Sequence, residues 1–466
     1  MTYSGTSAHL RVPAAAALHP EPVPATARDK RIAIVSASIG AGHDGAAAEL
    51  ARRLTSHGFV VDRFDLLDLL PVHLGQLVRD SYHRMLVRAP WAYQRVYRST
   101  ERAGGGGPLA RALLRTAEER VFRTLHPDTG AVVSTYPGAS RVLGSLRLRG
   151  RLTVPVLTYL TDFSVHPLWV ADGVDVHLAA HAVPAAQARA AGAQDVRVSG
   201  PVVDPRFCPG SAVERHTARA RFGLPGNTPL ALLVAGSWGV GPVRQVALEL
   251  RDCGAAVPVV VCGRNKALAE RLRADGIEHA FGWVDDMPAL MQAADVLVQN
   301  AGGLSSLEAF ATGLPVASYR CIPGHGLTNA AALEEAGAAV WIRDPARLKV
   351  ALCDLIHGPL GLSQRAIGFA LFTAEGEGGP AAEIGRIHSA VSPPQSPRFT
   401  APRHHPAARR LVATTAVACG VWACAVGTGI ATAYEGSGVI HAIGHSLDRD
   451  DPPPHHIFHV EGHHHS

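Results

Sequence analysis

Short runs of β-branched and other apolar residues recur along the chain and alternate with longer stretches of helical periodicity. Such runs are typical of parallel strands that are buried on both faces of a sheet. The alternation therefore predicts an α/β fold built from doubly wound, Rossmann-like sheets. The expected strands are Arg31–Ala37, Ala131–Thr135 and Val154–Thr161 in a first series, and Leu230–Ala235, Val257–Cys262, Val296–Gln299 and Pro315–Tyr319 in a second.

Two domains follow from this pattern, because 466 residues exceed one ordinary core. We place the first domain at residues 30–205 and the second at residues 206–391. Two such domains in sequence leave a cleft between the carboxyl ends of their sheets, where these folds bind ligands. Residues 1–29 lack a basic start followed by an apolar run, so we expect a disordered extension and not a signal peptide.

The C-terminal part has a different composition. Residues 392–410 are rich in Pro and Arg and are expected to form a linker, and residues 411–434 contain no charge. As a helix of about 36 Å, residues 411–434 would exceed the ~30 Å hydrocarbon core, which predicts a transmembrane helix. The alternative is a buried helix or an unstructured remnant. The arginines before this segment would keep the preceding domains cytoplasmic, at the cell membrane.

The remaining composition excludes several classes of protein. A formal net charge of +5 gives no reason to expect nucleic acid as a partner. Seven scattered cysteines without CxxC spacing favour neither a disulfide framework nor a zinc site. The tail at residues 435–466 contains eight histidines, which we expect to bind metals only adventitiously.

A glycine-rich turn ends the first expected strand, as Ser36-Ala-Ser-Ile-Gly40-Ala-Gly42-His43. Glycines let a ligand approach the backbone closely, and the helix that follows offers free N–H groups. A histidine at this position can accept a proton from a hydroxyl group near neutral pH. The alternative is a structural His43 that caps the helix.

A second group of polar side chains ends another strand of the first domain, as Thr161-Asp162-Phe-Ser-Val-His166-Pro-Leu-Trp169. Asp162 and His166 are candidates to orient each other or an acceptor hydroxyl, and Trp169 to pack against a sugar or lipid. An aspartate at a strand end is also typical of a turn or a helix cap.

Residues 79–123 contain ten Arg and four acidic residues, interleaved with Tyr82, Trp91, Tyr93 and Tyr97. Basic residues beside aromatic ones favour an anionic membrane surface. The alternatives are a nucleic-acid patch or solvated helix faces.

The second domain holds a run of glycines and hydroxyls at an expected helix start, followed by Glu308 one turn into the helix. Backbone N–H groups at such a start can hold a diphosphate, and a carboxylate can accept both hydroxyls of a ribose. Taken alone, this pattern favours an ordinary helix start.

In order and spacing, residues from Arg31 to Val391 resemble the GT-B glycosyltransferases that comprise monogalactosyldiacylglycerol synthases, processive diacylglycerol glucosyltransferases and the peptidoglycan N-acetylglucosaminyl transferase. Gly40-Ala-Gly-His43 resembles their Gly-Gly-Gly-His loop, and Thr161-Asp162-x-x-x-His166-x-x-Trp169 matches a second motif. The resemblance implies an acceptor-binding first domain and a second domain that binds the UDP-sugar. The implied catalytic residues are His43, Asp162 and His166, and the implied donor-binding residues are Gly236, Ser237, Val284, Gly302, Gly303, Ser305, Ser306, Glu308, Gly324, His325 and Asn329.

Three departures from the family pattern affect the site. Asp44 follows His43 where Arg is usual, and Asn300 replaces a frequent Lys or Arg. His325 and Gly326 stand where the family has Gln and Glu, which read hydroxyls of the donor sugar. Since His keeps one donor and one acceptor, a sugar contact at position 325 remains feasible.

The function that the resemblance implies is inverting transfer of a hexose from a UDP-sugar to a membrane lipid, most simply diacylglycerol. No metal or other cofactor is expected, since backbone N–H groups would stabilise the leaving UDP. Two alternatives stay open. One is a glycosyltransferase with a soluble acceptor or a UDP-sugar epimerase; the other is a catalytically silent UDP-sugar-binding membrane protein.

Overall fold

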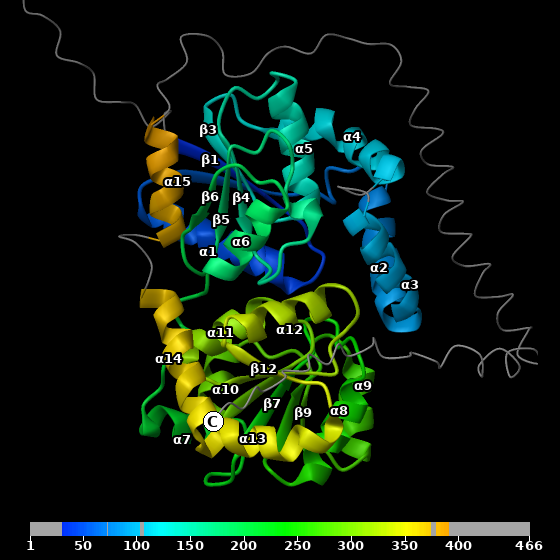
Figure 1. The fold of residues 1–466 in the computed structure, drawn as a ribbon, viewed down its shortest axis with the longest axis vertical. Helices are drawn as coiled ribbons and strands as arrows, with labels where there is room; N and C mark the ends of the chain where they lie inside the picture. Colours follow the sequence, from blue (N-terminus) through cyan, green and yellow to red (C-terminus); the bar gives the residue numbers. More distant parts are fainter. Residues whose placement is uncertain (1–29, 72, 103–106, 374–378, 391–466) are drawn as a thin grey trace, which may run out of the picture. The chain divides into compact units, whose positions relative to one another are not determined.

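The computed structural model describes residues 30–71, 73–102, 107–373 and 379–390, and Figure 1 draws them as a coloured ribbon. They form two α/β domains, each with a six-stranded sheet in which every strand pair is parallel. This confirms the predicted fold class. The predicted extension at residues 1–29, linker at 392–410, transmembrane helix at 411–434 and tail at 435–466 lie outside the described residues.

The N-terminal sheet has the strand order β2-β1-β3-β4-β5-β6. Its central strands are buried along their whole length, because helices cover both faces of the sheet. The strands are β1 (Arg31–Ser36), β2 (Val60–Asp65), β3 (Thr129–Ser134), β4 (Val156–Leu160), β5 (Val176–Ala179) and β6 (Val196–Val198). The helices are α1 (Ala41–Ser56), α2 (Leu74–Arg88), α3 (Pro90–Arg102), α4 (Gly107–Thr124), α5 (Pro137–Leu148), η2 (Pro167–Trp169) and α6 (Ala182–Ala190).

The C-terminal sheet has the order β12-β11-β10-β7-β8-β9. Its strands are β7 (Leu230–Val234), β8 (Val257–Val261), β9 (His279–Phe281), β10 (Val296–Gln299), β11 (Val316–Tyr319) and β12 (Ala339–Ile342). The helices of this domain are α7 (Ala212–Arg221), α8 (Val243–Cys253), α9 (Lys266–Ala274), α10 (Met287–Ala293), α11 (Leu304–Thr312), α12 (His325–Glu335), η3 (Pro345–Arg347), α13 (Leu348–His357) and α14 (Pro359–Thr373), and α15 (Gly379–Ala390) follows them in the chain.

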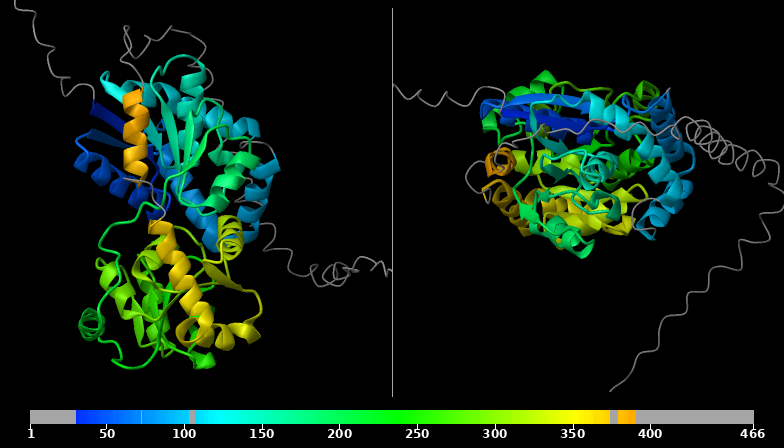
Figure 2. Two further views of the ribbon diagram at one scale, coloured as in Figure 1. Left: turned by 60° about the vertical axis from the view of Figure 1, so that its left-hand side comes forward. Right: turned by 90° about the horizontal axis from the view of Figure 1, so that it is seen from above.

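The last described helix, α15, does not pack with the domain that precedes it. It contacts α1, and its Ala381 and Ile384 are fully buried in the hydrophobic core of the N-terminal domain. Glu383 on the same helix pairs with Arg197 of β6. Figure 2 shows α15 in orange beside the N-terminal domain. The structural boundary therefore differs from the predicted 206–391, because α15 completes the other core.

Among the described residues, no helix is both long and apolar enough to cross a membrane.

Candidate active site

A cleft of about 880 Å³ lies between the two domains, which together form one compact unit. Loops at the carboxyl ends of both sheets line it, as expected of doubly wound domains, because the backbone N–H groups at the starts of the following helices point there. The N-terminal side contributes His43, Asp162 and His166. The C-terminal side contributes Gly236, Ser237, Val284, Gly302, Gly303, Ser305, Glu308 and His325.

His43 lies in the first turn of α1, directly after the glycine turn, whose Gly40 has a φ of 83°. Its Nδ1 is 2.7 Å from the Oγ1 of Thr161, at the end of β4. The imidazole also contacts the rings of Tyr136 and Trp169, with centroids 5.4 and 5.8 Å away. These contacts fix the ring, and Nε2 makes no hydrogen bond to a described residue. That nitrogen is therefore available to an acceptor hydroxyl.

The residue that orients His43 is Thr161, which the sequence reasoning had not assigned to the site. Asp162, the predicted helper, instead accepts a hydrogen bond from Nε1 of Trp169 at 3.2 Å. Asp162 still lines the cleft. In the sequence, the position of Thr161 directly before Asp162 in the motif is what could have indicated a role in the site. Which of the two side chains contacts His43 is visible only in the folded structure.

His166 lines the cleft, but protein groups occupy both ring nitrogens. Nδ1 accepts a hydrogen bond from the backbone N–H of Leu168 at 3.0 Å and thereby caps η2. The proton is consequently on Nε2, which lies 3.3 Å from the carbonyl oxygen of Tyr97 and 3.2 Å from Oγ1 of Thr100. Burial lowers the pKa of His166 and favours this neutral form. These contacts indicate that His166 holds α3 against η2.

The donor side of the cleft is built around the start of α11. Gly302 has a φ of 71°, and a Cβ there would lie 2.7 Å from the Cβ of Asn329, so the tight turn requires glycine. The turn presents the N-terminus of α11 to the cleft, where backbone N–H groups and the helix dipole favour a phosphate. Ser305 lines the cleft. Ser306 is fully buried instead, and its hydroxyl has no hydrogen-bond partner among the described residues.

Glu308 lines the cleft one turn into α11. Burial raises the pKa of its carboxyl to about 7, and the nearby charge of Asp204 adds to this effect. Asp204 is itself held by Arg206, whose guanidinium lowers the pKa of Asp204. The carboxyl of Glu308 therefore lies in a poorly solvated part of the cleft, with no described cation paired to it.

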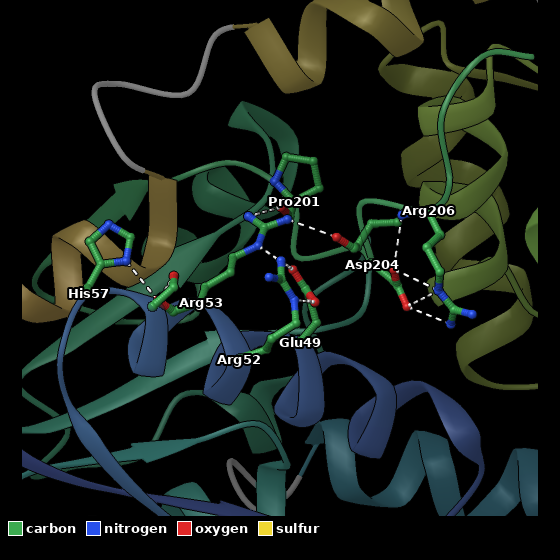
Figure 3. A network of polar contacts seen from close by, with 9 residues as sticks. Glu49, Arg52, Arg53, His57, Pro201, Asp204 and Arg206 are labelled. Carbon is green, nitrogen blue, oxygen red and sulfur yellow. Dashed lines mark hydrogen bonds and ion pairs between the residues drawn. The ribbon is translucent and has the colours of Figure 1, made fainter.

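A polar network holds the connection between the domains next to this part of the cleft (Figure 3). Glu49 on α1 accepts hydrogen bonds from Arg52 and Arg53. Arg53 also donates to the carbonyl oxygen of Val203 at 2.9 Å. The next residue in the connection, Asp204, pairs with Arg206. Because Glu49 is 6% exposed, the pairing satisfies a buried charge and fixes the connection to α1.

The segment that begins with Gly324 differs from the pattern that the sequence implied. Among its three predicted donor-binding residues, His325 lines the cleft, whereas Gly324 and Asn329 do not. The amide of Asn329 is fully buried: Oδ1 accepts from the backbone N–H of Ser164 at 2.7 Å, and Nδ2 donates to Ala301 at 2.9 Å. In this structure Asn329 thus ties the two domains together.

The helices α2 and α3 also connect the domains. Tyr82, Tyr93 and Tyr97, which we expected to face a membrane, pack with Trp238 and Ile322 of the C-terminal domain in one hydrophobic cluster. They face inward because aromatic area of this size is more stable when buried. Trp91, the fourth predicted aromatic residue, is 62% exposed.

Within the described ranges, no group of three or more His, Cys, Asp or Glu residues is arranged to hold a metal ion.

Two doubly wound domains that face one cleft, with a histidine on one side and a glycine-lined helix start on the other, are the arrangement of a GT-B glycosyltransferase. The comparisons agree with this class, and the chain is a glycosyltransferase. Residues 43–203 match the family model of monogalactosyldiacylglycerol (MGDG) synthase, and residues 242–358 match that of glycosyl transferases group 1. The resemblance seen in the motifs is thereby confirmed.

Among curated proteins, the chain is similar to the processive diacylglycerol beta-glucosyltransferase of Bacillus pumilus (strain SAFR-032), with 26% identity over 67% of this chain and 83% of that protein. The Bacillus subtilis (strain 168) protein of the same name is 29% identical, over 45% of this chain and 56% of that protein. The chain thus spans little more than half of the second relative.

A solved structure shares the fold. The crystal structure of TcCGT1 in complex with UDP matches with a TM-score of 0.50 and 12% identity, over 77% of this chain and 98% of that chain.

Proposed function

We propose that this glycosyltransferase moves a hexose from a UDP-sugar to the hydroxyl of a membrane lipid, with diacylglycerol as the simplest acceptor, and inverts the anomeric centre. The observation that carries the proposal is the placement of His43 across one cleft from the start of α11 and Glu308. The match of residues 43–203 to MGDG synthase and the names of the two Bacillus relatives support a lipid acceptor. The relatives' names also make glucose the first donor to test.

The proposed reaction is a single in-line displacement. Nε2 of His43 takes the proton of the acceptor hydroxyl while the acceptor oxygen bonds to the anomeric carbon. The bond from that carbon to the β-phosphate oxygen breaks, and UDP leaves with the electron pair. Backbone N–H groups at the start of α11 and its helix dipole stabilise the leaving diphosphate, so the proposal includes no metal. Glu308 accepts hydrogen bonds from the ribose hydroxyls.

Membrane attachment is part of the proposal. The outer faces of α2 and α3 expose Val87 and Trp91 together with Arg88 and Arg95. An apolar and basic surface of this kind favours the headgroup region of an anionic bilayer, where the acceptor lies. We place the two domains on the cytoplasmic side of the cell membrane, with residues 411–434 as the predicted anchor.

The first test incubates the full-length protein with anionic liposomes that contain diacylglycerol and with UDP-glucose, UDP-galactose or UDP-N-acetylglucosamine in separate tubes. We expect a sugar-shifted lipid by mass spectrometry with one of the donors. UDP binding without a lipid product in any tube would contradict lipid glycosylation. Free sugar and UDP released without any acceptor would instead indicate an epimerase.

The second test replaces the proposed base. His43→Ala should lower the transfer rate by about 100-fold or more, because it removes general base catalysis. UDP binding should be nearly unchanged, because His43 lies on the acceptor side of the cleft. Loss of UDP binding in the same variant would contradict the assigned role.

A further inference from the structure

His325 has one ring nitrogen held and the other free. It begins α12 directly after Gly324, and its Nδ1 lies 2.9 Å from the hydroxyl oxygen of Tyr93. Nε2 makes no hydrogen bond to a described residue, and the side chain lines the cleft. Burial lowers the pKa of His325 and outweighs the nearby charge of Asp162, which raises it. The imidazole is therefore neutral and lies near the acceptor side of the cleft.

The next residue has no space for a side chain. Gly326 is buried, and a Cβ there would lie 2.6 Å from the carbonyl oxygen of Asn300 and 2.7 Å from the Cγ1 of Ile322. A carboxylate at this position would require the backbone to move. Within the His325-Gly326 pair, the imidazole is therefore the only side chain that can contact a ligand.

Tyr93 comes from the other domain. It lies on α3, is 8% exposed, and its ring abuts the turn before His325, since a Cβ on Gly324 would lie 2.6 Å from the Cε1 of Tyr93. Burial raises the pKa of Tyr93 well above its usual value, so the hydroxyl keeps its proton. The neighbouring Gln94 accepts a hydrogen bond from the backbone N–H of Gly324, and the Tyr97 hydroxyl lies 3.2 Å from that of Thr328. The segment 324–328 is thus fixed from α3.

From these contacts we propose that Tyr93 is a positioning residue for the donor: its hydroxyl holds Nδ1 of His325, so that Nε2 binds a hydroxyl of the hexose. The inference rests on the proposed function, since it requires a UDP-hexose in the cleft. In either tautomer, Nε2 remains the nitrogen that is open to the ligand. The acceptor domain therefore takes part in recognising the donor sugar, although it contributes no direct contact to that sugar through Tyr93.

The test measures binding of UDP, UDP-glucose and UDP-galactose to the full-length protein by calorimetry, without an acceptor. Tyr93→Phe keeps the packed ring and removes only the oxygen. We expect binding of the preferred UDP-hexose to weaken by about fivefold relative to UDP, the effect of one hydrogen bond. UDP alone should bind as in the wild-type protein, because UDP lacks the hexose whose hydroxyl Nε2 of His325 is proposed to bind.

Tyr97→Phe is the matched control. It removes a hydroxyl from the same helix and the same interface, but that hydroxyl contacts Thr328 and not His325. A general loosening of the interface would change UDP and UDP-hexose binding by the same factor in both variants. The proposal requires the ratio of the two affinities to change in Tyr93→Phe and to stay constant in Tyr97→Phe.

A double-mutant cycle with His325→Ala gives the decisive comparison. Without the imidazole, Tyr93→Phe should have no further effect on the affinity ratio. The proposal would be overturned if Tyr93→Phe changed the affinity ratio equally with and without the imidazole of His325, or if Tyr93→Phe left the ratio at its wild-type value. Either result would leave the proposed transfer reaction intact. Failure of the wild-type protein to bind any UDP-hexose would overturn both.

Discussion

The imidazole of His43 is held by a hydroxyl at one nitrogen and by two aromatic rings at its faces and edge. When Nδ1–H donates to Thr161, Nε2 carries the lone pair that a general base needs. The hydroxyl accepts this hydrogen bond in the productive tautomer and fixes the orientation of the ring. The nearest carboxylate in the motif, Asp162, contributes charge to the cleft without a hydrogen bond to His43 in this structure.

Removal of this hydroxyl is expected to affect catalysis more than binding. We expect Thr161→Val to lower the transfer kcat by about 10- to 100-fold, a substantial part of what a positioned base contributes. The Kd for UDP should stay unchanged. Thr161→Ser restores the hydroxyl and should recover most of the rate. A valine variant with the wild-type kcat would show that Thr161 does not orient the base.

Glu308 gives the cleft a pH dependence. Its pKa of about 7 exceeds its ordinary value of 4.5, so the folded protein binds this proton more tightly than the unfolded chain. The contribution to stability is therefore complete below about pH 4.5 and is lost as the pH rises to about 7. The affinity for the ribose changes with pH in the opposite direction and rises as the pH rises, because the ionised carboxylate is the better acceptor for two hydroxyls.

We therefore expect the affinity for UDP to increase between about pH 5.5 and 8, as measured by calorimetry. UDP itself gains charge near pH 6, so the comparison with Glu308→Gln carries the test. The glutamine variant should keep only the part of the increase that comes from the diphosphate. Identical pH profiles for the two proteins would contradict ionisation of Glu308 in this range.

Motif spacing predicted which loops form the site, but not every contact in it. Local patterns identified His43 and Glu308, because each stands at a fixed offset from a glycine turn and a helix start. Thr161, Tyr93 and Asn329 act through partners more than 100 residues away, and no local pattern encodes such pairs. The family resemblance assigned Asn329 to the donor, whereas its amide in this structure accepts from Ser164 of the other domain and donates to Ala301.

At the scale of elements, α2 and α3 have two faces of different character. Their inner face places Tyr82, Tyr93 and Tyr97 against the C-terminal domain. Their outer face exposes Leu77, Val87 and Trp91, whose residue surfaces are 41, 54 and 62% exposed. Composition predicted an interfacial region, but the assignment of each aromatic residue to a face depends on how the helices pack.

The outer face should bind anionic vesicles. We expect Arg88→Gln to weaken binding of the full-length protein to these vesicles by about fivefold, from the loss of one charge near the surface. Trp91→Ser should weaken it as well, because it removes apolar area. Co-sedimentation with vesicles measures the effect. UDP binding should not change in either variant, since both side chains lie outside the cleft.

Leu362→Ser provides a matched control, because Leu362 is also an exposed apolar residue, at 67%, but lies on α14 of the C-terminal domain. Equal losses of vesicle binding in Trp91→Ser and Leu362→Ser would show that α2 and α3 form no specific membrane surface.

For the molecule as a whole, the seven predicted runs lie within a residue or two of seven described strands, because strands buried on both faces are mostly apolar. The strands β2, β5, β6, β9 and β12 had no predicted run. The order of the strands in each sheet was not predictable in the same way, since neighbouring strands are separated by whole helices. The place of α15 is the clearest example. Nothing in the local sequence of residues 379–390 indicates that Ala381 and Ile384 pack in the N-terminal core.

The contribution of α15 to the N-terminal core can be measured. We expect Ile384→Ala to lower the free energy of unfolding by about 2–5 kcal/mol, the cost of a cavity at a fully buried site. Chemical denaturation with a probe in the N-terminal domain would report the change. Ile387→Ala, at a partly buried position of the same helix, should cost less. Equal costs at the two positions would contradict the packing described here.

The return of α15 also means that the N-terminal core is completed only after the second domain has been synthesised. Residues up to the interdomain connection leave the ribosome first, yet their core lacks Ala381 and Ile384 until the entire second domain has been synthesised. At the usual speed of translation, about 180 further residues take roughly ten to forty seconds. During that interval the side of α1 that packs against α15 lacks its cover, and the nascent first domain exposes apolar surface that the finished protein buries.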